Sequence, residues 1–260
     1  MLNYSTELWR FRYFWGSLVR MDIDRRYRGT WLGVGWSLAQ PLAMAAVMAL
    51  VFHKLFNRSL ADFAPMLVCG LVLWQYILGC AVGGCRCLVS GESFMRQVPA
   101  PMAMYPLRTV LATAFHFFVA IGTVFLGNAL ILGWEEPLAV LAILPTIPLL
   151  LLFGWSAAVL TGFAHAYFRD MHHLIEICMR MLFYATPIIY APEMLRDRGM
   201  GWLLDINPLA SLVEVVRMPL LGRGFPSTTS YIISVAMVLV ITGLAILTLN
   251  RLERRIIFQL

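Results

Sequence analysis

The residues best suited to polar chemistry gather just before the first long apolar stretch of the chain. Three arginines, Arg25, Arg26 and Arg28, are followed closely by Trp31 and Trp36. Guanidinium groups can hold phosphate through charge-assisted hydrogen bonds, and arginine and tryptophan also anchor membrane helices at the headgroup level. The residue types alone therefore predict a cationic, aromatic band at a membrane surface, with anchoring as the plainer interpretation.

The histidines and cysteines do not form the pattern of a metal site. His172 and His173 are adjacent near Asp170, and neighbouring side chains of a regular helix do not face one metal together. We therefore predict a solvated loop there and no metal. The cysteines lie in or beside apolar stretches and are interpreted as small buried side chains: Cys69, Cys80, Cys85, Cys87 and Cys178.

Ionisable side chains inside apolar stretches are costly to bury, so function is their default interpretation. His116 is isolated, so we interpret it as a hydrogen-bonded packing residue rather than a proton relay. Glu176 and Arg180 are four residues apart and can pair along one helix face. Ion-coupled transport therefore has little support in the sequence.

The chain also lacks a nucleotide-binding loop. Such a loop needs a lysine after a glycine-bounded run, and the only lysine, Lys54, follows Phe52 and His53. The run Gly154-Trp155-Ser156 does not complete a hydrolase elbow. If ATP drives this protein, a separate subunit must bind the nucleotide, and we predict neither catalysis nor a cofactor in this chain.

Composition indicates a membrane protein. The chain is 60% hydrophobic and 13% charged, with a mean hydropathy of +0.77, and a helix needs roughly 20 apolar residues to cross a bilayer. We predict an all-α polytopic fold with six transmembrane helices: residues 34–56, 65–85, 109–132, 138–165, 174–190 and 230–249. All belong to one domain, residues 1–260, in which 1–33 are cytoplasmic, 34–190 hold five spans, 191–226 lie outside, and 227–260 hold the sixth span and a tail.

The basic residues predict the orientation of the spans. With the N-terminus in the cytoplasm, thirteen basic residues lie on the inner side and six on the outer side, as the positive-inside rule requires. Both termini are then cytoplasmic, and the formal net charge of +6 calls for no nucleic-acid partner. The first thirty residues lack the pattern of a cleavable signal peptide.

The N-terminal segment has the pattern of an amphipathic helix lying in the inner interface. Its apolar residues share one side: Leu8, Phe11, Phe14, Trp15, Leu18 and Val19. Its polar residues lie opposite: Arg10, Ser17 and Arg20. A helix packed on a partner would show the same pattern, and the two interpretations are compatible.

The inner connection between the second and third spans, residues 92–101, carries Phe94 and Met95 and ends in prolines. A short helix with exposed apolar side chains suits docking into a groove of a soluble subunit. A simple connector would be more polar. We therefore predict a contact with a partner at this connection.

The outer connection, residues 191–226, is too long and too apolar for a plain loop. Asn207 and Pro208 would divide it into two short helices. We predict half-inserted helices in which Glu214 and Arg217 neutralise each other, and an external cap that packs a dimer is the plainer alternative.

Three groups of residues, in register, resemble one known family. They are residues 26–41 at the first span, residues 168–171 ahead of the fifth, and residues 185–190 with 206–209 and 214–217. Together they closely resemble the membrane permease subunit of ABC exporters for lipid-linked polysaccharides, the group handling O-antigen, capsule and teichoic acid. Each piece alone is a weak motif, but the set covers nearly the whole chain.

The resemblance implies roles for particular residues. A lipid-linked phosphate would arrive at Arg25, Arg26, Arg28, Trp31 and Trp36. An ATPase would be contacted by Glu92, Phe94, Met95, Arg96, Arg169 and Asp170. Sugars would pass a conduit formed by Phe52, Phe56, Arg180, Phe183, Tyr184 and Tyr190. An outer gate would include Trp202, Asn207, Pro208, Glu214 and Arg217.

The resemblance also implies an assembly. Two copies of this chain would pair with two ATPase subunits, which bind ATP and Mg²⁺, and export an O-antigen-like polysaccharide on a polyprenyl or other lipid across the bacterial inner membrane. A permease for a drug or small lipid stays open as an alternative. An intramembrane polyprenyl-lipid transferase would need clustered carboxylates, and the inner acidic residues are scattered: Asp22, Asp24, Glu92, Asp170 and Glu253.

Overall fold

The computed structural model describes residues 2–56, 59–95, 97–98, 100–131, 133 and 137–256. Every regular element in these residues is helical, which confirms the predicted all-α class. The α-helices are α1 (Leu2–Arg10), α2 (Arg12–Tyr27), α3 (Trp36–Leu55), α4 (Leu60–Cys87), α5 (Glu92–Met95), α6 (Met104–Ile131), α7 (Ile143–Tyr167), α8 (Met171–Ala185), α9 (Pro192–Asp197), α10 (Trp202–Ile206), α11 (Pro208–Leu220) and α12 (Thr228–Ile256). Short 3-10 turns, η1 (Gly33–Gly35), η2 (Val89–Gly91) and η3 (Pro137–Ala142), precede α3, α5 and α7.

Five helical stretches in the described residues are long and apolar enough to cross a membrane: Gly33–Leu55, Leu60–Cys87, Met104–Ala129, Leu138–Tyr167 and Thr228–Glu253. They correspond to the predicted first four spans and the sixth. The predicted fifth span, 174–190, corresponds to α8, which has 15 residues and extends roughly 22 Å. The helix stops early because Thr186 precedes Pro187 and adopts the extended backbone that a following proline favours.

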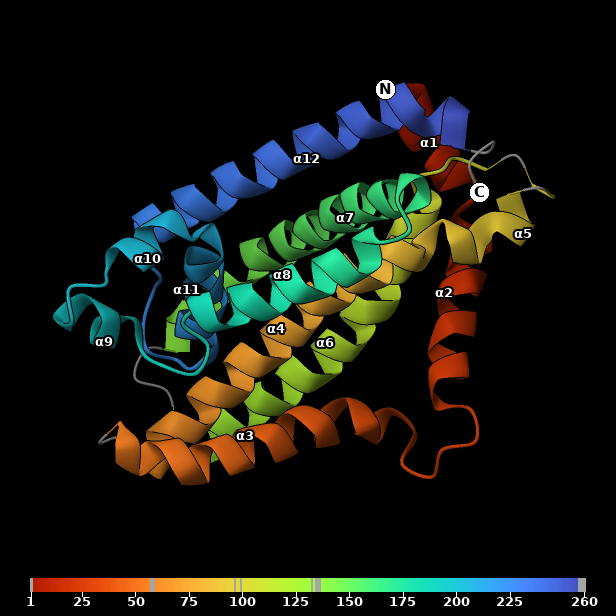
Figure 1. Cartoon of the computed structure of the whole chain (residues 1–260). Coiled ribbons are helices and arrows are strands. Elements are labelled where there is room, and N and C mark those ends of the chain that lie inside the picture. Colours follow the sequence, from red (N-terminus) through yellow and green to blue (C-terminus); the bar gives the residue numbers. More distant parts are fainter. Residues whose placement is uncertain are drawn as a thin grey trace.

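The long helices run in alternating directions (Figure 1). One end of the bundle carries α5 and the C-terminal part of α12, and the other carries α9 and α10; we refer to these as the α5 end and the α9 end. Helices α3, α6 and α8 run toward the α9 end, and α4, α7 and α12 run back. Although α8 is short, it therefore continues the alternation.

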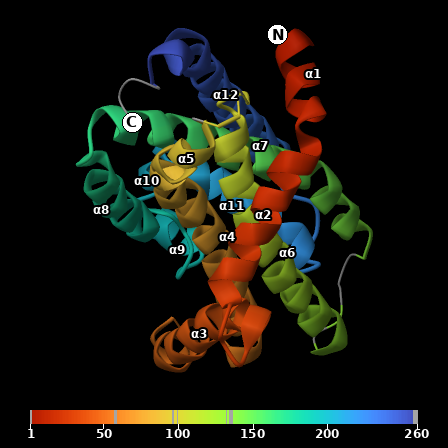
Figure 2. The same ribbon diagram turned by 90° about the vertical axis from the view of Figure 1, so that its right-hand side faces the viewer.

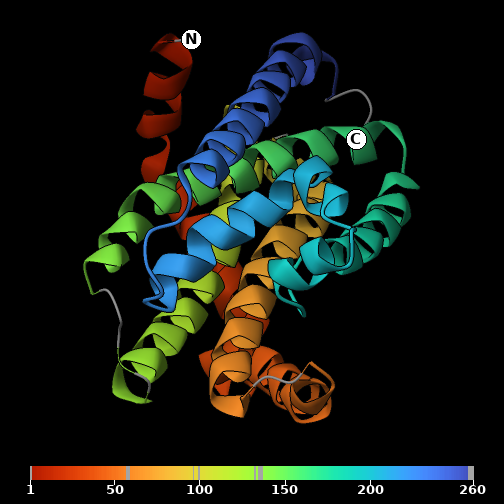
Figure 3. The ribbon, with the colours of Figure 1, turned by 90° about the vertical axis from the view of Figure 1, so that its left-hand side faces the viewer.

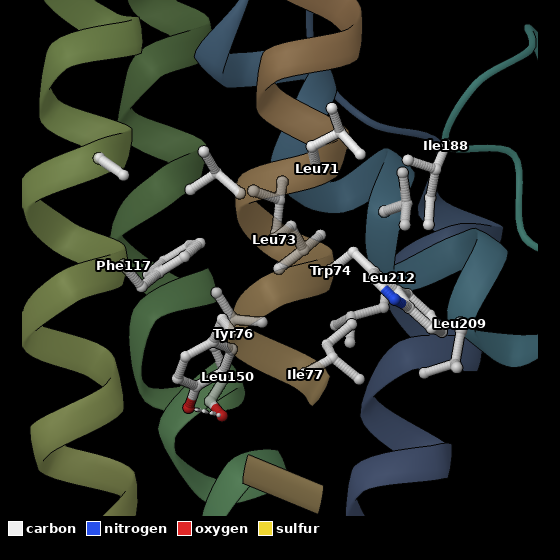
Figure 4. Close-up of a cluster of buried hydrophobic side chains, with 14 of the residues drawn as sticks. Leu71, Leu73, Trp74, Tyr76, Ile77, Phe117, Leu150, Ile188, Leu209 and Leu212 are labelled. Atoms are coloured by element: carbon white, nitrogen blue, oxygen red, sulfur yellow. Dashed lines mark hydrogen bonds between the residues drawn. The ribbon is translucent and has the colours of Figure 1, made fainter. Parts of the chain in front are cut away.

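The centre of the bundle is α4, which packs on α3, α6, α7 and α8. Small residues let α4 and α7 approach closely: a Cβ atom on Gly84 would lie 2.5 Å from the Cα atom of Ala158. Nearby, the buried Tyr76 hydroxyl donates to the carbonyl oxygen of Leu150 at 2.8 Å (Figure 4). The main apolar core therefore surrounds α4.

The N-terminal helices lie across the α5 end of the bundle, where α2 crosses and contacts α6 (Figure 2). The predicted apolar side of α2 is present and faces this chain's own core: Leu18 is buried, and the Phe14 ring meets the Phe94 ring edge-on at 6.2 Å. On the same interface Arg108 of α6 forms an ion pair with Asp22 of α2. The N-terminal segment is thus packed on the bundle by both apolar contacts and charge.

The chain divides at Asn207, as predicted, with α10 before it and α11 after it. Of these two helices α11 is the buried one, and it packs against α4, α7 and α12 (Figure 3). By contrast, α3 and α12 present many apolar side chains on the outside of the chain, including Val47 and Leu239, each more than 60% exposed. These outer surfaces suit lipid or another protein chain.

Candidate functional site

A cavity of about 400 Å³ lies where α2 ends and α3 begins, with α4 and α6 forming its other walls. Of the five residues predicted to meet a lipid phosphate, Arg26 and Trp36 line this cavity. Arg26 is exposed and has no acidic partner in the described part of the chain. The cavity thus presents an unpaired cation beside an indole ring.

The other three predicted phosphate ligands do not line the cavity. Arg25 and Arg28 are exposed on α2 and just after it, and Trp31 is 97% exposed. The turn between α2 and α3 contains two glycines in the left-handed region, Gly29 at φ +79° and Gly33 at φ +52°. This turn brings Trp36 to the cavity and leaves Trp31 outside it.

Three polar side chains from different helices meet inside the cavity. The Tyr27 hydroxyl is hydrogen-bonded to the Ser37 hydroxyl and, at 2.8 Å, to Nδ1 of His116. Ser37 Oγ also lies 3.2 Å from the same nitrogen. These contacts join α2, α3 and α6, so the interpretation of His116 as a hydrogen-bonded residue is confirmed. His116 is also part of the cavity wall.

Two amide side chains, Gln40 of α3 and Gln75 of α4, line the same cavity. Neither makes a hydrogen bond to another residue that the structure describes. Gln75 lies inside the apolar stretch Leu60–Cys87, where an amide without a partner is costly. The cavity therefore combines a cation with hydrogen-bonding groups that are open to a ligand or to water.

The predicted ATPase contact differs from the structure in one respect. Phe94 and Met95 were expected to be exposed, but both are half-buried against the α2 core, and Arg108 lies over the Phe94 ring at 5.9 Å. The exposed side chains of this segment are instead polar or small, such as Ser93 and Gln97. Phe94 and Met95 pack α5 against the apolar side of α2, because this contact removes apolar surface of both helices from water. Arg96 lies outside the described residues, and Glu92 is half-buried.

At the turn between α7 and α8, Arg169 and Asp170 are exposed, as an ATPase contact requires. The prediction of a solvated loop is wrong for His172, which is buried on α8 and accepts a hydrogen bond from Arg86 at 3.0 Å. Glu176 lies 3.4 Å from the same ring nitrogen of His172. Glu176 therefore lies beside the hydrogen bond between Arg86 and His172, and in the described residues it forms no ion pair with Arg180, which is exposed. No group of metal ligands occurs in the residues described.

The predicted conduit residues form two separate aromatic groups within one chain. Phe52 stacks on Phe56 at 5.7 Å at the end of α3. On α8, Phe183 contacts the buried Trp74 at 5.5 Å, and Tyr184 is 67% exposed. Tyr190 lies beyond the helix and donates to the Tyr184 carbonyl at 2.9 Å. Partial burial raises the pKa of the Tyr190 phenol, so it remains a neutral donor.

At the α9 end, two of the predicted gate residues converge on the segment that leaves α8. Asn207 caps α11 by accepting from the Leu209 backbone N–H at 3.1 Å. Its amide donates to Thr186 Oγ1 at 2.9 Å and to the Ala185 carbonyl at 3.2 Å. Pro208 occupies the first turn of α11, where its fixed φ suits a helix start. The division at Asn207 therefore also holds the end of α8.

Arg217 is the second of these residues. It is buried and donates to the carbonyl oxygens of Pro187 at 2.8 Å and Ile188 at 3.2 Å. The predicted pairing with Glu214 is wrong: Glu214 accepts from the backbone N–H of Ser227 and the hydroxyl of Ser230, where α12 begins. Arg217 and Glu214 therefore bind different parts of the chain: Arg217 the segment after α8, and Glu214 the start of α12. Trp202, by contrast, is 58% exposed and remains apart.

A protein-family model described as ABC-2 type transporter matches residues 13–221, which include the cavity, α5 and the convergence at Arg217. The chain belongs to the ABC-2 type transporter family. Three relatives are similar to this ABC-2 transporter subunit, and each is named O-antigen export system permease protein RfbA. Two come from Klebsiella pneumoniae, at 26% identity over 201 residues and 25% over 197, each covering 75% of both chains. One comes from Myxococcus xanthus, at 24% over 218 residues and 82% coverage.

Several residues of this ABC-2 transporter subunit were missed by the sequence analysis. Tyr27, Ser37 and Gln75 line the cavity, but Tyr27 and Ser37 are ordinary residues in their local sequence. Gly70 packs tightly against Arg217, since a Cβ on it would lie 2.5 Å from a guanidinium nitrogen. The one available signal was Gln75, a polar residue in an otherwise apolar span.

Proposed function

We propose that this chain is the transmembrane subunit of an exporter that carries an O-antigen-like, lipid-linked polysaccharide across the bacterial inner membrane. The observation that carries the proposal is the cavity at the α2–α3 corner, where Arg26 and Trp36 meet polar side chains of α4 and α6. An unpaired guanidinium in such a place is suited to a phosphate headgroup. The names of its three relatives, all O-antigen export permeases, support the same substrate class.

The proposed topology has six crossings with both termini in the cytoplasm. In it α8 is the fifth crossing, shortened because the chain turns at Pro187 and continues through α9, α10 and α11 at the outer face. The alternating directions in Figure 1 support this assignment. The α5 end is then cytoplasmic, and α2 lies at the inner membrane surface with Arg25, Arg28 and Trp31 facing the headgroups.

The proposed assembly has two copies of this chain and two ATPase subunits that hold ATP and Mg²⁺. The connection around α5, together with Arg169 and Asp170, would meet the ATPase. Movement there would open a pathway between the two copies, past the aromatic side chains of α3 and α8. Sugar rings can move past aromatic side chains, because contact with an aromatic face does not depend on strong directional hydrogen bonds. The segment α9–α11 would close the outer side.

The test is depletion of this protein in its native cell, with lipid-linked polysaccharide measured on each side of the inner membrane. Accumulation inside, loss at the surface and rescue by the wild-type chain are expected, whereas a disrupted 92–101 connection should not rescue. Unchanged polysaccharide on both sides would overturn the proposal and favour export of a small molecule.

Two charge variants separate the phosphate site from plain anchoring. Arg26→Gln should lower surface polysaccharide several-fold, because Arg26 lines the cavity. Arg28→Gln removes the same charge two residues away from a side chain outside the cavity, and it should leave export near the wild-type level. Equal effects of the two variants would assign both arginines to anchoring.

A further inference from the structure

A separate apolar cavity lies near the α5 end, on the side of the bundle away from α3 (Figure 1). It measures about 640 Å³ and lies between α6, α7 and α12, with Leu8 contributed by α1. In Figure 3, α1 and the end of α12 stand apart at the top of the view, and α7 crosses below them. This α7–α12 cavity shares no lining residue with the cavity at Arg26, so it is a site of its own.

The α7–α12 cavity opens on the outside of the chain. Among its lining residues, Pro148 and Leu152 of α7 and Asn250 of α12 are exposed. Leu247, one turn before Asn250, is 52% exposed and extends the same apolar surface along α12. Because α7 and α12 both belong to stretches long and apolar enough to cross a membrane, an opening of this composition meets hydrocarbon rather than water.

The size of the cavity suits one acyl chain of a single leaflet. Along α7 the lining extends from Pro148 to Trp155, which is about 10 Å of helix, and one leaflet offers about 15 Å of hydrocarbon. At roughly 30 Å³ for a water-sized group, the cavity holds on the order of twenty carbon-sized groups. A single side chain of another protein would fill only part of that volume.

The polar groups beside the opening favour an anionic headgroup. Arg251 directly follows Asn250 on α12, is exposed, and forms no ion pair with another described residue. The Asn250 amide likewise has no hydrogen-bond partner among the residues that the structure describes. In the proposed topology the α5 end is cytoplasmic, and the cytoplasmic leaflet is the one that carries anionic lipid. A phosphatidylglycerol headgroup at Arg251, with one acyl chain in the cavity, would satisfy both features.

The wall of the cavity includes the segment that joins α5 to α6. In this segment the Met102 backbone N–H donates to the Glu253 carboxylate of α12 at 2.9 Å, and the Ala103 carbonyl accepts from the Trp155 indole of α7 at 3.3 Å. Ala103 and Trp155 both line the cavity. An acyl chain there would therefore pack against the residues that attach the α5–α6 segment to α7, and would replace the dispersion contacts that an empty cavity lacks.

We infer that the α7–α12 cavity binds an acyl chain of an anionic phospholipid from the inner leaflet, with the headgroup at Arg251 and the chain against Leu152 and Trp155. The bound lipid holds the α5–α6 segment in place, and α5 belongs to the connection proposed to meet the ATPase. The choice of leaflet and the link to the ATPase rest on the proposed function, whereas the binding of the lipid does not. The site lies apart from the proposed route of the polysaccharide, so its lipid acts on the protein without being exported.

The test uses the full-length chain in phosphatidylcholine nanodiscs that contain a small fraction of phosphatidylglycerol with a diazirine near the end of one acyl chain. After illumination, saturable label is expected in peptides that contain residues 148–155 and 246–250. Excess unlabelled phosphatidylglycerol should remove this label. Unsaturable label spread along the exposed side of α12, or equal competition by added phosphatidylcholine, would overturn the inference.

A matched pair of variants tests the apolar part of the site. Leu152→Trp fills the cavity and should lower the saturable label about tenfold. Leu144→Trp adds the same ring to the same helix at a residue that is 64% exposed and outside the cavity, and it should label as the wild type does. Equal labelling of the two variants contradicts the inference. A cross-link between two copies through Leu152→Cys would assign the cavity to a second copy instead.

A second pair tests the headgroup. Arg251→Gln should reduce the preference for phosphatidylglycerol over phosphatidylcholine several-fold. Arg198→Gln removes the same charge from an exposed residue at the α9 end, and it should keep the preference. An unchanged preference in Arg251→Gln would mean that the charge beside the cavity does not select the lipid.

Hydrogen exchange tests the effect on the α5–α6 segment. The Met102 amide should exchange several-fold more slowly in nanodiscs with phosphatidylglycerol than in phosphatidylcholine alone, because the lipid stabilises the segment that contains it. Equal exchange in the two lipids would contradict that effect.

The labelling and the export test fail independently, because labelling needs neither an ATPase nor a substrate. If depletion of the protein leaves surface polysaccharide unchanged while the label is saturable and selective, the proposed function is wrong and the lipid site stands. If export depends on the protein but the label is unsaturable, the exporter stands and the site is wrong. Since the label is mapped on the wild type, a variant that does not fold leaves this decision intact.

Discussion

The guanidinium of Arg217 on α11 lies against the backbone of Ile188, just after α8, and donates to its carbonyl oxygen at 3.2 Å. A second hydrogen bond, to the Pro187 carbonyl oxygen at 2.8 Å, means that the two terminal nitrogens of the guanidinium bind two consecutive carbonyls. The chain leaves α8 here because of Pro187, and the freed carbonyls need donors. Arg217 supplies them, which is how a buried arginine that has no carboxylate partner in the described part of the chain is accommodated.

Gly70→Ala should disturb the two hydrogen bonds of Arg217. A Cβ on Gly70 would lie 2.5 Å from a guanidinium nitrogen of Arg217 and 3.1 Å from Cγ2 of Ile188. Because both neighbours are buried, we expect a loss of about 1–3 kcal/mol and a lower melting temperature of the detergent-solubilised protein. Gly122→Ala adds the same methyl group to α6 in open space, and it should leave the melting temperature unchanged or slightly higher. Equal melting temperatures for the two variants would contradict the packing at Gly70.

Asn207→Ala should weaken the same region by a different route. The substitution removes the cap of α11 and two donors to Ala185 and Thr186, so the expected loss of stability is about 1–3 kcal/mol. Hydrogen exchange should rise at the end of α8 and the start of α11. Asn250→Ala changes an exposed asparagine of α12 and serves as control. A rise confined to α11 would mean that Asn207 is only a cap.

Much of the fold follows from the sequence, because apolar stretches of membrane length are decided locally. The segments around α3, α4, α6, α7 and α12 were predicted from hydropathy alone, and the break at Asn207 from its proline. The end of α8 was predicted too late, since an apolar run continues to residue 190 although Pro187 ends the helix. Hydropathy measures affinity for lipid and does not include the backbone geometry before a proline.

The candidate site was only partly predictable. Arg26 and Trp36 were found because their types are distinctive, but three similar neighbours proved to lie outside the cavity. The partners of charged residues were the weakest predictions, as with Arg217, because the sequence shows near neighbours and the structure uses distant ones. Arg217 is bound to residues about thirty positions earlier in the chain, a relation that no local pattern contains.

The ion pair of Asp22 with Arg108 gives a prediction about the N-terminal helices. Asp22→Leu leaves the nearly buried Arg108 without its partner, which should cost roughly 3 kcal/mol and make α1 and α2 susceptible to protease. The double variant Asp22→Leu, Arg108→Leu removes both charges and should recover part of that stability. If the double variant is no more stable than Asp22→Leu alone, the pair is not what holds α2 on α6.

The final prediction separates the packing role of α5 from its proposed contact with the ATPase subunit. Phe94 packs on Phe14 and beneath Arg108, whereas its neighbour Ser93 is exposed. Phe94→Ala should therefore lower the melting temperature, by removing a half-buried ring. Ser93→Trp should leave the melting temperature unchanged but reduce co-purification of the ATPase subunit, because a bulky side chain would occupy the surface that meets it. Val235→Trp, on the exposed face of α12, controls for the added ring. Normal ATPase recovery with Ser93→Trp would place the contact elsewhere, with Arg169 and Asp170 the next residues to substitute.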